Sequence, residues 1–200
     1  MKSNIPSIYR INHSNQISQG DILHNFPIYY YNYDDESLDF LELSYCIIVS
    51  QDCDLTQHFN AYNEKKKLLS EGLNEEDSKV KSKTNKIIPS VMLVEGFPAE
   101  QLRTGTHLST LNLYTPQISK ENKTPWKNIL QNETPRYHYL CEDDAMNQSS
   151  IVFDFKRYYT VSTSYIYSKF SDYYLISLNE LYRENLSSRF ANYLSRIGLP

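Results

Sequence analysis

The sequence predicts an α+β fold: one domain with a curved, mostly antiparallel sheet or a small SH3-like barrel, and a packed amphipathic helix at the C-terminus. Three observations carry this prediction. Runs of β-branched and aromatic residues recur along the chain, these runs do not alternate regularly with helical patterns, and one long helical periodicity stands at the end. With 200 residues, residues 1–200 are expected to form a single domain around a real core.

The first strands are expected near the N-terminus. Residues 21–32 are rich in β-branched and aromatic side chains, and Pro27 within them suits an edge or a bulge. An acidic turn at 34–37 leads to a second strand at 38–50, which ends in an apolar run typical of burial on both faces. The tyrosines of these and later runs suit a half-buried sheet whose hydroxyls reach solvent.

The middle of the chain is expected to mix helices and strands. Asp54 is placed to cap a helix from Leu55 into the 60s, and the charge-dense residues 63–86 are predicted to be a solvated helix or a mobile insertion. Further strands are expected at 86–97, 136–141 and 150–162, short helices at 99–111 and 126–130, and another strand in the aromatic stretch 164–176.

The C-terminal helix has the clearest pattern. Ser177 and Glu180 have the spacing of a capping box, which places the start of the helix at about Leu178. Apolar residues then recur at helical spacing, and Gly198 with Pro200 is expected to stop the helix.

Composition excludes several classes of protein. The chain has only 5 Gly, and no two are spaced for a phosphate-binding loop; HExxH, GxSxG and CxxC are also missing. A net charge of −4 argues against a surface that is basic all over, although it permits a local basic groove. Three cysteines at long spacing and no apolar N-terminal region predict a cytoplasmic protein that does not enter a membrane.

Asp52 and Asp54 are the first candidate site. On an extended segment two carboxylates one residue apart point the same way and can together hold Mg²⁺ or Mn²⁺. The alternative is structural, with Asp54 capping a helix and Asp52 in a turn. Cys53 is then expected to point to the other face as a small buried hydrophobe.

Asp154 and Lys156 are the second candidate. The Asp-x-Lys pattern on a strand resembles half of the metal-dependent restriction-endonuclease site, which implies a carboxylate on Mg²⁺, a lysine that stabilises developing charge, and Asp143 or Asp144 as a further acid. An alternating strand with an outward polar face gives the same pattern.

Other candidates are a zinc site and several cations. A zinc site can be drawn from Cys53, His58, His138 and Cys141. Cations interleave with aromatic residues at Arg157, as on a surface that binds single strands. The C-terminal helix carries Arg183, Arg189 and Arg196, which either contact phosphates or a partner's acids or form an ordinary solvated face.

Two resemblances bear on function. Gly20-Asp21-Ile22, then residues 47–52, resemble the opening of the MazF/PemK toxin family, which implies a small SH3-like barrel that cuts RNA; that family's arginine has no counterpart at residues 42–44. Residues 50–54 and 196–200 are similar to a Ser-Gln-x-Cys-Asp motif and an Arg-x-Gly-Leu-Pro ending in uncharacterised bacterial proteins, which implies defence or conflict loci.

The sequence therefore predicts a component of a bacterial toxin-antitoxin or phage-defence system that binds nucleic acid or a protein encoded nearby. The alternative is a metal-dependent nuclease that uses Asp52 and Asp54, or Asp154 and Lys156, with Mg²⁺ or Mn²⁺ as cofactor.

Overall fold

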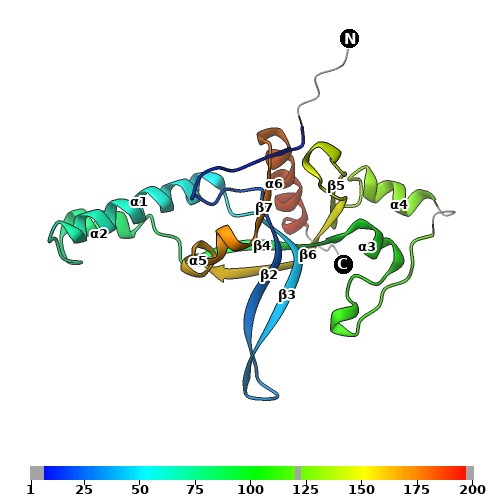
Figure 1. Ribbon diagram of the computed structural model, residues 1–200, viewed down its shortest axis with the longest axis horizontal. Coiled ribbons are helices and arrows are strands. Elements are labelled where there is room, and N and C mark those ends of the chain that lie inside the picture. Colours follow the sequence, from blue (N-terminus) through cyan, green and yellow to red (C-terminus); the bar gives the residue numbers. More distant parts are fainter. Residues whose placement is uncertain (1–6, 120–122, 197–200) are drawn as a thin grey trace, which may run out of the picture.

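The protein is built around one curved sheet. The computed structural model describes residues 7–119 and 123–196, and within them seven strands pair in the order β1-β7-β2-β3-β4-β6-β5, every pair antiparallel (Figure 1). The strands are β1 (Tyr9–Arg10), β2 (Asp21–Asn32), β3 (Ser37–Ile48), β4 (Ser90–Pro98), β5 (Tyr137–Leu140), β6 (Ile151–Ser162) and β7 (Tyr174–Leu178). The predicted α+β class with a curved antiparallel sheet is confirmed.

Both faces of the sheet are covered. Neighbouring residues such as Ile22 and Leu23, or Ile47 and Ile48, belong to two different buried clusters because side chains alternate along a strand. Helix α6 (Glu180–Leu194) completes one cluster with Leu186 and Phe190, whereas α1 (Asp52–Ser70) and α5 (Thr163–Tyr173) complete the other. This explains the continuous apolar run at the end of β3.

Two short helices close the far end of the sheet. Helices α3 (Ala99–Thr104) and α4 (Lys123–Leu130) form a smaller buried cluster with Val152 of β6. Single 3₁₀ turns lie at Ser109–Leu111 and Asp144–Met146. The helix expected over 99–111 ends at Thr104, because Gly105 takes the left-handed conformation with φ of 77°.

The expected strand at 164–176 is wrong for most of its length. Residues Thr163–Tyr173 form α5, and strand β7 begins only at Tyr174. The buried residues of α5 are Thr163, Ile166 and Phe170, which recur at helical spacing. The strand preference of the tyrosines in this segment is overridden by that periodicity.

The start of the C-terminal helix is also different from the expectation. Ser177 and Leu178 belong to β7, and the Ser177 hydroxyl donates to the buried Asp21 carboxylate (2.5 Å) rather than capping a helix. Helix α6 begins at Glu180 after Asn179. The expected stop at Gly198 and Pro200 lies outside the described residues.

The charge-dense segment is helical. Helix α1 continues to Ser70, and α2 (Ser78–Thr84) folds back beside it, with Val80 buried between them. Figure 1 shows that the two helices extend away from the sheet. The buried residues of α1 are Leu55, His58 and Ala61, all in its first half, so only that half is attached to the core.

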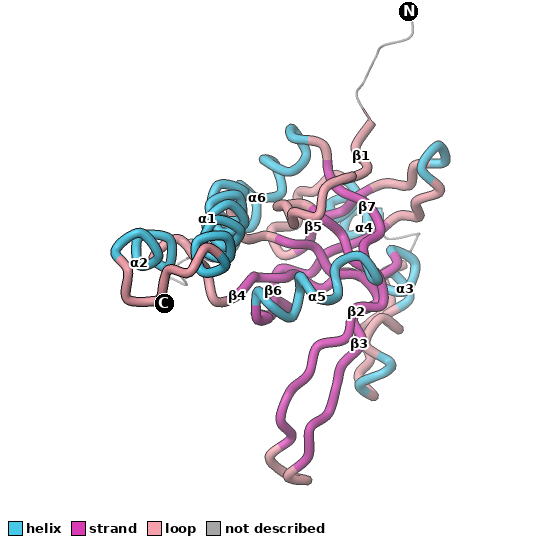
Figure 2. The backbone as a smooth tube through the Cα atoms, turned by 60° about the vertical axis from the view of Figure 1, so that its left-hand side comes forward, coloured by secondary structure: helices cyan, strands magenta, loops and turns pink. Residues whose placement is uncertain are grey.

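Strands β2 and β3 form a long hairpin that leaves the body of the protein (Figure 2). Pro27 lies inside β2 and its carbonyl accepts a hydrogen bond from the Tyr165 hydroxyl (2.7 Å). The backbone of Pro27 therefore faces the edge of β2 that lies opposite β3. Strand β7 pairs along this edge only with Asp21 to Leu23 and does not reach Pro27. The predicted edge position of Pro27 is confirmed.

No helix among the described residues has the length and apolar character needed to span a membrane.

Candidate functional site

Asp52 and Asp54 lie in the first turn of α1, so the expected extended segment is wrong. The expected cap at Asp54 is also wrong, because the helix begins at Asp52 after Gln51. Residues two apart on a helix differ by about 200° in direction, and the two carboxylates do not share a face. Asp52 accepts hydrogen bonds from the Gln19 backbone N–H (3.1 Å) and from Arg183 Nη1 (3.0 Å). Asp52 therefore ties α1 to α6, and a metal ion on Asp52 and Asp54 stays a prediction.

The zinc candidates are spread over separate elements. Cys53 is exposed at the start of α1, which corrects the expected buried position, and Cys141 is exposed after β5. His58 lies on α1 and His138 on β5. Within 7–119 and 123–196, no group of three or more His, Cys, Asp or Glu is arranged to hold a metal ion.

Asp154 is fully buried, which corrects the expected outward polar face of this part of β6. Its two carboxylate oxygens accept from Arg136 Nε (2.7 Å) and Nη2 (2.5 Å), and one also accepts from the Lys156 N–H (3.0 Å). The side chain of Lys156 is exposed. Asp143 caps a 3₁₀ turn through the backbone N–H groups of Ala145 and Met146.

A second ion pair lies beside the first. Arg157 donates to the buried Glu95 (Nε to Oε2, 2.5 Å), and the Tyr159 hydroxyl donates to the same oxygen (3.1 Å). Burial raises the pKa of Glu95, and the Arg157 guanidinium opposes that rise. Arg157 is thus paired with an acid of its own chain, and its contact with a nucleic acid stays a prediction.

A bulge brings these charges together. Val94 pairs with Tyr158 and Gly96 pairs with Phe153, so the single residue Glu95 lies opposite residues 154–157. A Cβ on Gly96 would come within 2.6 Å of the Phe153 ring, which makes glycine the residue that allows this close approach. The bulge thus places the Glu95–Arg157 pair beside the Asp154–Arg136 pair, and the formal charges of the four groups cancel.

The three arginines of the C-terminal region have different surroundings. Arg183 binds Asp52, as above. Arg189 donates to the carbonyls of Asn132, Thr134 (3.1 Å) and Tyr137 (2.7 Å). Arg196 follows the end of α6 and is exposed. Arg183 and Arg189 thus fasten α6 to the body, and Arg196 is the member of the set that faces solvent.

The strongest candidate for interaction is the projecting end of the hairpin, residues 27–43, which we call the hairpin arm (Figures 1 and 2). Strand β7 borders β2 only up to Leu23, and β4 borders β3 only from Tyr45. In the described part of the chain no third strand pairs with the arm. Both outer edges therefore present backbone N–H and C=O groups that are available for pairing.

One face of the hairpin arm is apolar. Tyr29 is paired with Phe40, and Tyr31 with Leu38, so these four side chains share a face. They are 56%, 61%, 50% and 70% exposed, respectively. The Tyr33 ring at the turn extends this face, with its centroid 5.1 Å from that of Tyr31. Large adjacent apolar side chains at such exposure are uncommon on a surface that binds nothing.

The hairpin arm is also strongly acidic. It holds five acidic residues and no Lys, Arg or His: Asp34, Asp35, Glu36, Asp39 and Glu42. The arm alone thus has more negative charge than the net −4 of the whole chain. The arm therefore combines an apolar face, two unpaired strand edges and charges of one sign, all of them negative.

The sequence interpretation did not single out this face. The signal was present, because Tyr29, Tyr31, Leu38 and Phe40 alternate with period two on both sides of an acidic turn that has no basic residue. Such a pattern predicts an apolar face, but only the extent of β7 and β4 shows that no third strand of the described chain continues beside it. Comparisons with protein-family models, curated proteins and solved structures gave no match to this chain.

Proposed function

We propose that this protein is a binding component that attaches to a partner protein through its hairpin arm. The setting that we expect from the sequence is a bacterial toxin-antitoxin or phage-defence system, with the partner encoded nearby. One observation carries the proposal: Tyr29, Tyr31, Leu38 and Phe40 form an exposed apolar face on an arm that pairs with no third strand among the described residues.

The geometry supports two kinds of contact at once. A strand of the partner can pair with an open edge of β2 or β3, and main-chain hydrogen bonds then give affinity. The four apolar side chains can fill pockets on the partner, and aromatic residues of this kind dominate the energy of protein interfaces. Both contacts use groups that already project from the body, so the folded core does not have to open.

Charge supports a basic protein as the partner. The five carboxylates of the arm repel phosphates, which disfavours RNA or DNA as the ligand of this face. The same carboxylates attract a surface rich in Lys and Arg and raise the rate of association. We therefore infer a partner with an apolar groove bordered by basic residues.

A metal-dependent nuclease stays a prediction. Asp154 would have to exchange the Arg136 guanidinium for a metal ion, and Asp52 would have to release Arg183. Cleavage of RNA or DNA that needs Mg²⁺ or Mn²⁺, and that Asp154→Asn abolishes in a folded protein, would support the nuclease.

The test uses the full chain and the purified proteins encoded beside it. Calorimetry compares the wild type with Tyr31→Ser/Leu38→Ser, and a matched control changes Leu113 and Tyr114, which are 52% and 71% exposed outside the arm, to Ser. We expect the arm variant to weaken binding at least tenfold, or about 1.4 kcal/mol, and the control to bind like the wild type. Equal weakening in both variants, or no binding to any neighbouring protein, would contradict the proposal.

A further inference from the structure

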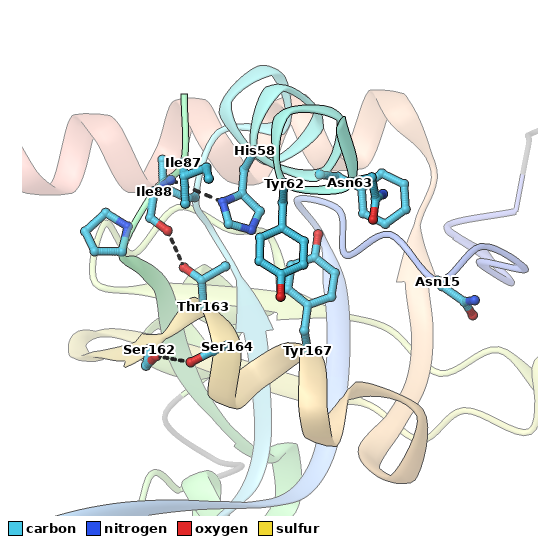
Figure 3. Close-up of a pocket in the computed structure, with 12 residues that line it drawn as sticks. Asn15, His58, Tyr62, Asn63, Ile87, Ile88, Ser162, Thr163, Ser164 and Tyr167 are labelled. Carbon is cyan, nitrogen blue, oxygen red and sulfur yellow. Dashed lines mark hydrogen bonds between the residues drawn. The ribbon is translucent and has the colours of Figure 1, made fainter. Parts of the chain in front are cut away.

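A pocket of about 490 Å³ lies on the side of the sheet covered by α1 and α5, apart from the hairpin arm (Figure 3). Its walls include His58, Phe59 and Tyr62 from α1, Tyr167 from α5, and Ile88 and Pro89 from the segment before β4. The volume lies in the range of about 300 to 1,000 Å³ that is usual for small-molecule sites.

The aromatic walls are nearly parallel. The His58 and Tyr62 ring centroids are 5.9 Å apart with 14° between their planes, and those of His58 and Tyr167 are 5.7 Å apart with 18° between the planes. Phe59 lies 6.2 Å from Tyr167 at 26°. His58 and Tyr62 are four residues apart on α1 and so share a helix face. These rings offer flat surfaces of one orientation to a ligand.

His58 supplies a polar group at a fixed place. It is buried, and its Nδ1 accepts a hydrogen bond from the backbone N–H of Ile88 (3.1 Å). Because Nδ1 is an acceptor, the neutral ring carries its proton on Nε2. Burial lowers the pKa of His58, which favours this neutral form. In Figure 3 this second nitrogen lies on the side of the ring away from Ile88. The pocket thus contains an N–H donor beside the aromatic surfaces.

The opposite wall is held in place by hydrogen bonds. The Thr163 hydroxyl donates to the Ile88 carbonyl (2.8 Å), and the Thr163 N–H donates to the Pro89 carbonyl (3.0 Å). Ile88 is therefore bonded both to α1, through His58, and to α5, through Thr163. Because these bonds fix the distance between the helices, the pocket exists before a ligand arrives.

None of the 12 described residues that line the pocket is Asp, Glu, Lys or Arg. Transfer of a phosphate, carboxylate or ammonium group into such a site would leave that charge without a partner. The lining selects a neutral ligand, and the parallel rings select a planar one.

We propose that this pocket binds a neutral, planar heteroaromatic ring of the nucleobase type, which stacks on the Tyr62 and Tyr167 rings and accepts a hydrogen bond from His58 Nε2. Tyr62 is 53% exposed and lies at the outer side of the pocket, where the ligand ring enters. The same chemistry has two sources, a free nucleoside or an unpaired base of a single-stranded nucleic acid.

The test is saturation-transfer NMR on the full chain with adenosine, guanosine, cytidine and uridine. At least one nucleoside should receive saturation on its base protons, and Tyr62→Ala should weaken its binding by about fivefold or more. Tyr114→Ala is the control, because Tyr114 is an exposed tyrosine outside the pocket. His58→Phe keeps a ring but removes the donor and should also weaken binding.

Two results would overturn the assignment: no saturation transfer to any of the four nucleosides at millimolar concentration, or the same affinity in Tyr62→Ala as in the wild type. Tyr62 is largely exposed, so Tyr62→Ala is expected to fold, and near-ultraviolet circular dichroism checks this. A short single-stranded RNA oligonucleotide of the base that binds identifies the source. Tighter binding than the corresponding nucleoside indicates an unpaired base, and equal or weaker binding indicates a free nucleoside.

Discussion

Several titratable side chains are buried in protonation states that the fold imposes. Burial lowers the pKa of His58, His107 and His138, and it raises the pKa of Asp21 to about 6. The ring nitrogens of His138 have no hydrogen-bond partner in the described part of the chain. The three histidines make the protein sensitive to acid, because each must gain a proton when the chain unfolds below about pH 6.5.

We expect His138→Leu to reduce this acid sensitivity. Burial and the nearby Arg189 lower the pKa of His138 to about 3, so its contribution to stability is complete above pH 6.5 and falls as the pH drops toward 3. Between pH 7.5 and pH 5 the wild type should lose about 2 kcal/mol more than the variant. Urea unfolding at the two pH values measures this difference, and parallel losses would contradict it.

The Asp154–Arg136 pair should respond differently to the loss of each partner. The Asp154 side chain is fully buried, whereas that of Arg136 is 38% exposed and can turn toward water. Arg136→Leu leaves a buried carboxylate without its guanidinium and should cost about 3 kcal/mol or more, whereas Asp154→Leu should cost less. Urea unfolding of both variants checks the order, and the reverse order would show that Arg136 is the partner more dependent on the pair.

These pairs could not be predicted from the sequence. Asp154 and Lys156 stood out because they are two residues apart, but the partner that decides the role of Asp154 is 18 residues away. Glu95 and Arg157 are separated by 62 positions, and Asp52 and Arg183 by 131. A single sequence shows which residues carry charge, but the folded sheet determines which charges meet.

At the scale of elements, strands were easier to predict than helix ends. Strands β2, β3, β5 and β6 follow from their β-branched and aromatic composition and from the turns between them. The start of α6 was wrong because Ser177, which has the spacing of a cap, is bound to Asp21 instead. Local patterns therefore gave the elements, and long-range hydrogen bonds changed their boundaries.

Helix α6 is fastened to the body by Arg189, so we expect this residue to be structural. Arg189→Leu removes donors from the carbonyls of Asn132, Thr134 and Tyr137 and should cost about 2 to 4 kcal/mol. Arg189→Lys should restore little, because one ammonium group lacks the planar fork of guanidinium donors. Arg196→Leu is the exposed control, with an expected change within about 0.5 kcal/mol.

Thermal unfolding of these three variants gives the comparison. If Arg189→Leu and Arg196→Leu proved equally mild, Arg189 would be free to serve as the phosphate contact that the sequence suggested. A loss of stability in Arg189→Leu alone would show that Arg189 is structural. Of Arg189 and Arg196, only Arg196 would then be able to contact a ligand.

The whole molecule consists of a sheet covered on both faces and two parts that extend from it. Helices α1 and α2 extend on one side, and the hairpin arm extends on another (Figures 1 and 2). The sequence predicted a charged helix or insertion at residues 63–86 and a turn at 34–37, and these residues lie in the two extending parts. It could not predict how far each extends, because that depends on where β7 and β4 stop pairing.

We expect that the hairpin arm can be shortened without destabilising the body of the protein. Tyr29 and Phe40 are directly paired, so replacing residues 30–39 with Asn-Gly closes the hairpin with a two-residue turn. We expect the free energy of unfolding of the shortened protein to lie within about 1 kcal/mol of the wild-type value. Tyr30, Tyr31 and Leu38, which are removed, are 49%, 50% and 70% exposed. Calorimetric unfolding measures this, with loss of partner binding as the second readout. A much lower melting temperature would show that the arm supports the core.

The open edges of the arm have a consequence for the molecule when it is alone. Two copies could join strand to strand along these edges and build a continuous sheet, which is a common route to aggregation. The carboxylates of Asp34, Asp35, Glu36, Asp39 and Glu42 would then be brought together in pairs, and their repulsion opposes this contact. Salt screens that repulsion over a distance of about 10 Å at 0.1 M. Charge repulsion therefore keeps the unbound protein from self-associating, and we expect self-association to begin at high ionic strength.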